Sequence, residues 1–125
     1  MQPLLLCIHM EPEKLTRVSM LSLSLGIKVI EAKKEDYGQT LSALCGITGK
    51  KPNPPSCQVP GEMMVMAFFP GKLLDDFLSL LRKNGIPPIP LKAVLTEHNQ
   101  AWHLGQLYLM LSQEAMMMEK GKNNR

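Results

Sequence analysis

Five residues that could bind or transform a small ligand lie close together between residues 90 and 102. They are Lys92, Thr96, His98, Asn99 and Trp102, the only tryptophan of the chain. The surrounding pattern predicts a short apolar strand, a polar turn and the start of a helix. Open α/β sheets bind ligands where their strands end, and the free N–H groups at the start of a helix attract anions. We therefore expect a candidate anion site, in which Lys92 and backbone amides bind the anion.

In this site Thr96 and Asn99 would orient the anion, and Trp102 would close one wall. The same residues also fit a purely structural role. Either Thr96 or Asn99 can accept a hydrogen bond from the N–H groups of the following turn, and Trp102 can simply pack. The sequence leaves both interpretations open.

His9 and Lys72 are a second pair of candidate ligand-binding residues. His9 follows the first predicted strand and Lys72 follows the third. In a sheet of strand order 2-1-3-4 the two residues would lie across the switch point, where α/β sheets bind ligands. The alternative is that His9 is a structural side chain without a ligand.

Thiol and metal chemistry receive less support from the sequence. Cys57 lies in a proline-rich loop, and a pair with His9, His98 or His103 is conceivable, although no spacing supports one. An ordinary loop cysteine is the simpler interpretation. His98 and His103 are five residues apart, and no Cys-x-x-Cys or His-Glu-x-x-His motif is present, so we expect no metal and no cofactor.

Four apolar runs of strand length alternate with four helical patterns. This alternation is typical of an α/β sheet with helical crossovers. The expected strands are 4–8, 27–32, 63–69 and 91–95, and the expected helices are 12–25, 35–45, 73–84 and a last one that includes residues 104–118. Between them, residues 46–61 hold four prolines and form a surface loop.

The predicted strand at 63–69 is apolar at every position, so it should be central and covered on both faces. The second and fourth strands carry charged residues and should be edges. We expect a mostly parallel sheet of order 2-1-3-4 with helices on both faces, in one α/β domain spanning 1–125. A ferredoxin-like α+β sheet of order 4-1-3-2 is the alternative.

The last helix carries two apolar stripes. At about 100° per residue, one stripe should cover the sheet, and its members are Leu104, Leu107, Tyr108, Leu111, Ala115 and Met118. The residues on the other side form a candidate interface, namely Trp102, Leu109, Met110, Met116 and Met117. A second stripe should meet another surface, so we expect a homo-oligomer. The alternative is a methionine-rich end that stays exposed or lies under the long loop.

Composition limits the partners and the location of the chain. The formal net charge is +3, and Lys120, Lys122 and Arg125 supply all of it, which leaves the rest of the chain neutral. This distribution argues against a nucleic-acid partner, apart from a weak, salt-sensitive contact of the tail. No apolar segment reaches the length of a membrane span. Three widely spaced cysteines and the absence of a secretory signal predict a cytoplasmic protein.

Several segments together resemble a family of small bacterial proteins that is known only as a domain of unknown function. The specific part of the resemblance is the signature Leu-Lys-Ala-Val-Leu-Thr-x-x-Asn-x-x-Trp, which spans 91–102. Less specific parts are the segment 39–46, the Phe68-Phe69 strand end, the helix at 74–78 and the Asn84-Gly85-Ile86 stop. Family members often have proline after the threonine, where this chain has Glu97. The resemblance implies no activity, substrate or cofactor.

Two functions are therefore open. The first is a non-catalytic cytoplasmic module that acts through protein contacts, above all self-association along the last helix. The second is a binder of a small anionic ligand, or an enzyme, with its site at the turn that follows the fourth strand.

Overall fold

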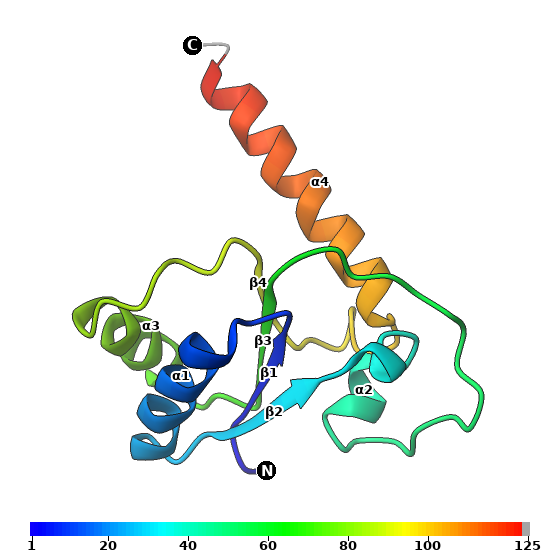
Figure 1. Cartoon of the computed structure of the whole chain (residues 1–125), viewed down its shortest axis with the longest axis horizontal. Helices are drawn as coiled ribbons and strands as arrows, with labels where there is room; N and C mark the ends of the chain where they lie inside the picture. Colours follow the sequence, from blue (N-terminus) through cyan, green and yellow to red (C-terminus); the bar gives the residue numbers. More distant parts are fainter. Residues whose placement is uncertain (124–125) are drawn as a thin grey trace.

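A four-stranded mixed sheet forms the centre of the protein, which we describe from a computed structural model (Figure 1). The structure describes the backbone of residues 1–123 and the side chains of residues 1–118. The strand order is β2-β1-β3-β4, and two of the three strand pairs are parallel. This confirms the predicted α/β fold with order 2-1-3-4. The basic side chains of Lys120, Lys122 and Arg125 lie outside the described residues.

The sheet is built from two β-α-β units. The elements of the two units are β1 (Leu4–Ile8), α1 (Pro12–Ser24), β2 (Lys28–Ala32), β3 (Met63–Ala67), α3 (Leu73–Lys83) and β4 (Lys92–Val94). Within each unit the two strands are parallel, whereas β1 and β3 pair antiparallel where the units meet. Parallel crossovers are almost always right-handed, so reversing the second unit leaves α1 and α3 on the same face of the sheet, side by side in Figure 1.

The sheet separates two apolar cores. Alternate residues of β1 and β3 point to opposite faces, as the strand pleat requires. Leu5 and Met64 join the core beneath α1 and α3, whereas Leu6 and Val65 join the core on the other face. All five side chains of β3 are buried, so this strand is central and covered on both faces, as its sequence predicted.

The opposite face is covered by short helices and a loop. These are η1 (Lys34–Asp36), α2 (Leu41–Leu44), the long loop and the first turns of α4 (Leu104–Asn123). The single helix predicted at 35–45 is wrong in detail, because η1 ends at Asp36 and a separate helix begins after Thr40. The Thr40 hydroxyl accepts a hydrogen bond from the Ala43 backbone N–H at 3.2 Å and caps a new, shorter helix.

The last helix leaves the body of the protein. Leu104 and Leu107 are buried in the core, and Tyr108 and Leu111 pack at its edge, but Gln113 and the next five residues are all exposed. Of the stripe predicted to cover the sheet, Ala115 and Met118 therefore do not cover it. The projecting part of α4 is the orange and red helix in Figure 1. Among the described residues, no helix has both the length and the apolar character that crossing a membrane requires.

Candidate functional site

The turn after β4 is closed by its own hydrogen bonds. The Thr96 backbone N–H donates to Asn99 Oδ1 at 2.8 Å, and the Asn99 backbone N–H donates to Thr96 Oγ1 at 3.1 Å. The Asn99 side-chain amide also donates to the Val94 carbonyl at 3.0 Å. Asn99 is buried, and both ends of its amide are bonded. These bonds show a structural role for Thr96 and Asn99. They also occupy two of the backbone N–H groups that would have to bind an anion.

The residues after this turn brace α2. The backbone N–H groups of Leu41 and Ser42 donate to the carbonyls of Trp102 and Gln100, each at 2.9 Å. Trp102 packs against the core on the α2 face, and the exposed His98 ring meets it edge to face at a centroid distance of 5.3 Å. Because Trp102 precedes α4 and packs inward, it does not extend the exposed stripe of that helix, which corrects its assignment to the interface.

Lys92 lies on the other side of the sheet from Trp102. It pairs in register with Met64, whose side chain points into the core under α1 and α3. The Lys92 ammonium donates to the Ile89 carbonyl at 3.1 Å and lines a hollow of about 200 Å³ at the end of α3. The structure therefore brings Thr96, His98, Asn99 and Trp102 together but does not bring Lys92 to them.

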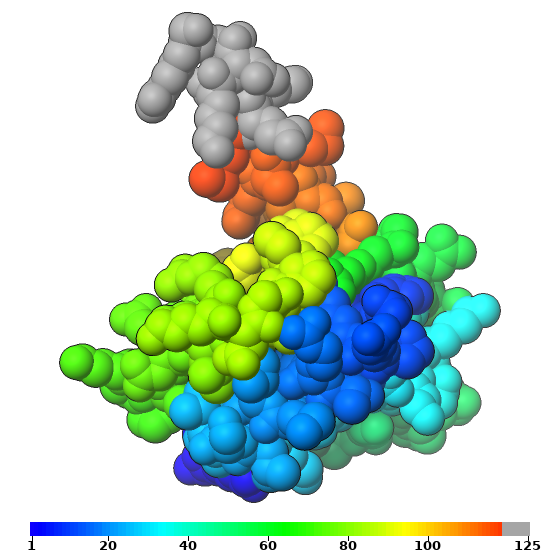
Figure 2. Space-filling view, turned by 60° about the vertical axis from the view of Figure 1, so that its left-hand side comes forward, coloured from blue at the N-terminus to red at the C-terminus, as the bar shows by residue number. Residues whose placement is uncertain are grey.

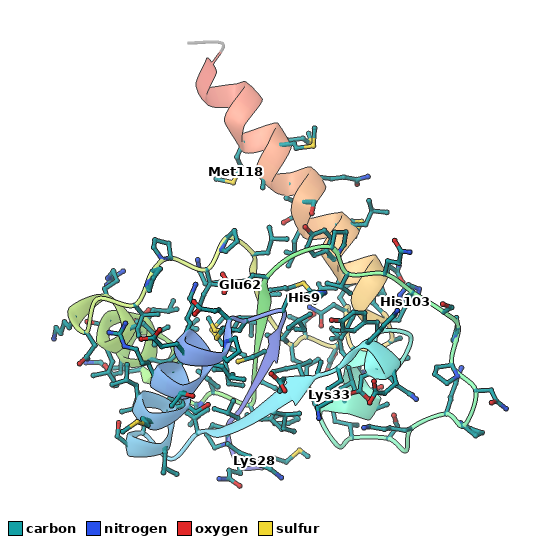
Figure 3. All side chains as sticks on the ribbon, in the orientation of Figure 1. His9, Lys28, Lys33, Glu62, His103 and Met118 are labelled. Atoms are coloured by element: carbon teal, nitrogen blue, oxygen red, sulfur yellow. The ribbon has the colours of Figure 1, made fainter. Side chains whose placement is uncertain are left out.

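His9 and Lys72 do not meet, contrary to the expectation from a parallel sheet. Because β1 and β3 pair antiparallel, the C-terminal end of β1, which His9 follows, and the C-terminal end of β3, which precedes Lys72, lie at opposite ends of the sheet. At about 3.3 Å per residue, the length of β1 alone separates the two positions by about 16 Å. Ile8 pairs with Met63, so His9 lies near Glu62, which precedes β3 (Figure 3), whereas the end of β3 pairs with Leu4 at the start of β1.

A different group of polar side chains does come together, around Cys57. The Cys57 sulfur lies 3.6 Å from His103 Nδ1. Nearby, the Tyr37 hydroxyl and His9 Nε2 form a hydrogen bond of 2.9 Å. Burial raises the pKa of the Tyr37 hydroxyl, and the carboxylates of Asp36, Glu31 and Glu35 add to the rise, so the phenol stays protonated at neutral pH.

Two hollows meet at Cys57. One, of about 380 Å³, is lined by His9, Tyr37 and Val59, and the other, of about 450 Å³, by Glu35 and Ser56. Cys57 and Lys34 line both of them. His9, which lines the first hollow, has a φ of 54°, a value that is rare for residues other than glycine.

Two glycines allow the loop to approach closely enough to hold Cys57 in place. A Cβ atom on Gly38 would lie 1.8 Å from the Pro55 carbonyl oxygen. A Cβ atom on Gly105 would lie 3.2 Å from the Cys57 Cβ and 3.4 Å from His103 Nδ1. The end of the long loop is thus docked on α4 and on the segment before α2.

Sequence reasoning named Cys57 and His103 as one conceivable pair but had no basis for choosing it. The two residues are 46 positions apart, so no local spacing could reveal the contact. Gly105 at the start of an otherwise apolar helix was the available signal, because a glycine there often marks a close backbone approach.

The exposed face of α4 is the other notable surface. Its large apolar side chains include Leu109, Met116 and Met117, which are 56%, 61% and 73% exposed. In Figure 2 the orange part of the helix stands clear of the body.

Comparison with known proteins finds a match to a family model. Residues 62–118 match the model of the family "Domain of unknown function (DUF3783)". The matched part contains β3, α3, β4 and α4 as far as Met118. No curated protein and no solved structure matches the chain. The comparisons therefore support a domain of unknown function and assign no activity to it.

Proposed function

We propose that the protein is a module that acts through contacts with copies of itself, made along the projecting part of α4. The observation that carries this proposal is the large apolar surface of α4 beyond the body. Leu109 and Met116 are seven positions apart and lie on one line of the helix, and Met110 and Met117 lie on the next. Met118, 69% exposed, points to the side opposite Leu109.

A helix that is apolar on several sides is normally buried. The body of this protein does not cover the exposed turns of α4, since Gln113 to Met118 are exposed at every position. Methionine side chains adapt to irregular surfaces. We therefore infer that another protein surface covers this helix.

The occupant that we propose is a second copy of the chain. Apolar surfaces are not directional, and a copy with the same helix is present wherever the chain is present. Two helices related by a two-fold axis can bury matching lines of Leu109 and Met116.

Solution mass with matched variants tests this proposal. We expect sedimentation at micromolar concentration to give twice the mass of one chain. The double substitution Leu109→Gln and Met116→Gln keeps helix propensity and removes apolar surface, so it should shift the mass to that of one chain.

The matched control changes two equally exposed apolar residues of α1, through Met20→Gln and Leu23→Gln. These side chains are 69% and 76% exposed and lie on another helix. The control should keep the doubled mass. A single-chain mass for the unmodified protein, or an equal loss of mass in both variants, would exclude α4 as the interface.

We also infer a cytoplasmic location and a bacterial origin for the module. Support for the location comes from Cys7, Cys45 and Cys57, all of which are free thiols. Support for the origin comes from the signature at 91–102, which lies within the family match over 62–118.

An anion at the turn after β4 receives less support from the geometry. Lys92 lies on the other face of the sheet from Trp102, and the Thr96 and Asn99 backbone N–H groups are already bonded.

A further inference from the structure

The contact between Cys57 and His103 joins a nucleophile to a base. Cys57 is half-buried in the docked end of the long loop, and His103 immediately precedes α4. Their S···N distance of 3.6 Å is within hydrogen-bonding reach of a thiol. A thiol next to an imidazole is the arrangement that nucleophilic catalysis uses, and such contacts are often long without substrate.

A backbone hydrogen bond sets the protonation form of His103. The Gln106 N–H donates to His103 Nδ1 at 3.0 Å, so this nitrogen carries a lone pair and the ring proton is on Nε2. The same nitrogen faces the Cys57 sulfur. The ring is therefore held in the form that can take the proton of the thiol.

The surroundings favour carbonyl chemistry over metal binding. In the part of the chain with described side chains, no group of three His, Cys, Asp or Glu residues could hold a metal ion, and zinc sites use at least three protein ligands. Cys57 instead lines two hollows at once. A planar carbonyl at the sulfur would have room for a group on either side.

The two hollows differ in character. Val59 and Pro60 give the first an apolar wall suited to an acyl chain, whereas Glu35 and Ser56 make the second more polar. The Lys34 side chain lines both hollows and can attract an anionic group on the substrate. We propose that Cys57 and His103 form a covalent acyl-accepting site for a small activated ester or thioester.

The reaction balances without any further reactant. The Cys57 sulfur attacks the carbonyl carbon while its proton passes to His103 Nδ1. The bond from the carbonyl carbon to the leaving oxygen or sulfur then breaks, and His103 returns the proton to the leaving group. Cys57 ends as an acyl thioester, and the Gln106 N–H can bond to Nδ1 again.

The test uses p-nitrophenyl acetate with the whole protein. We expect a rapid release of one p-nitrophenolate per chain at neutral pH, and peptide mass mapping should place the acetyl group on Cys57. Cys7 and Cys45 are buried and should stay unmodified. The rate should exceed that of N-acetylcysteine by at least about 100-fold. Cys57→Ser should abolish the rapid release.

His103→Asn separates the base from the helix cap. Asparagine caps a helix well but cannot act as the base, so this variant should keep the unfolding temperature while acylation slows by roughly 100- to 10,000-fold. His103→Ser provides a second capping variant with the same expected result. The proposal is overturned if Cys57 reacts no faster than N-acetylcysteine, or if a folded His103 variant is acylated at the unmodified rate.

Discussion

Asn99 closes its turn by three hydrogen bonds, two made by its side-chain amide and one donated by its backbone N–H. Removing the amide takes away the partner of the Thr96 N–H and of the Val94 carbonyl. We expect Asn99→Ala to lower the free energy of unfolding by about 1–3 kcal/mol, measured by urea denaturation. Glu97→Ala, an exposed neighbour, should change it by less than about 0.5 kcal/mol. Equal effects of the two substitutions would contradict the structural role of Asn99.

The buried thiol of Cys7 should make the protein sensitive to alkali. Burial raises its pKa from 9.0 to about 12, and the nearby carboxylates of Glu31 and Glu62 add to the rise. Above pH 9.0 the unfolded chain loses the thiol proton while the folded chain keeps it. The contribution of Cys7 to stability is therefore complete below pH 9.0 and is lost as the pH rises toward about 12.

Denaturation curves at several pH values measure this loss. Cys7 alone should steepen the fall in the free energy of unfolding by up to about 1.4 kcal/mol per pH unit. Cys7→Ala should make the alkaline fall shallower. An unchanged slope in that variant would show that other groups cause it. Cys45, whose pKa burial raises to about 11, should behave in the same direction.

At the scale of elements, the docking of the long loop depends on Gly38. A side chain at this position would meet the Pro55 carbonyl at 1.8 Å, so the loop must shift in Gly38→Ala. We expect a loss of about 1–3 kcal/mol in stability, which thermal unfolding would detect. Gly49→Ala lies within the long loop itself, has open space around it and should have little effect. The docked arrangement would be wrong if Gly38→Ala were as stable as Gly49→Ala.

Local sequence signals predicted most elements because those signals act over a few residues. Pro12 and Gly26 bracket α1, and Asn84 and Gly85 follow α3, so both helices lie within two residues of their predicted bounds. The helix at 35–45 was mispredicted because an apolar pattern continues across Thr40, whose hydroxyl starts α2 anew.

The candidate site was less predictable than the elements. Lys92 and Trp102 were grouped because they are close in sequence, but strand pleating sends Lys92 to the opposite face. Cys57 and His103 come together only through long-range packing of the loop on α4.

At the scale of the whole molecule, the sequence predicted the order of the strands and their mostly parallel pairing, but not that β1 and β3 run antiparallel. The charges of β2 and β4 marked them as edges, and the apolar run of β3 marked it as central. The sequence of a strand that is buried at every position does not indicate the direction of the strand relative to its neighbours. The antiparallel pairing of β1 with β3 could therefore not be predicted, and neither could the separation of His9 from Lys72 that results from it.

Because β1 pairs with β3, each half of the chain hydrogen-bonds the strand edge that the other half would otherwise expose. Residues 62–118, which the family match spans, contain β3 with only β4 beside it. As an isolated segment, it would expose the unpaired backbone N–H and C=O groups of Met63–Ala67 along one side of β3. Such an edge recruits strands from neighbouring molecules and leads to aggregation. Any stable protein made from this segment must therefore supply a strand in the place that β1 occupies here.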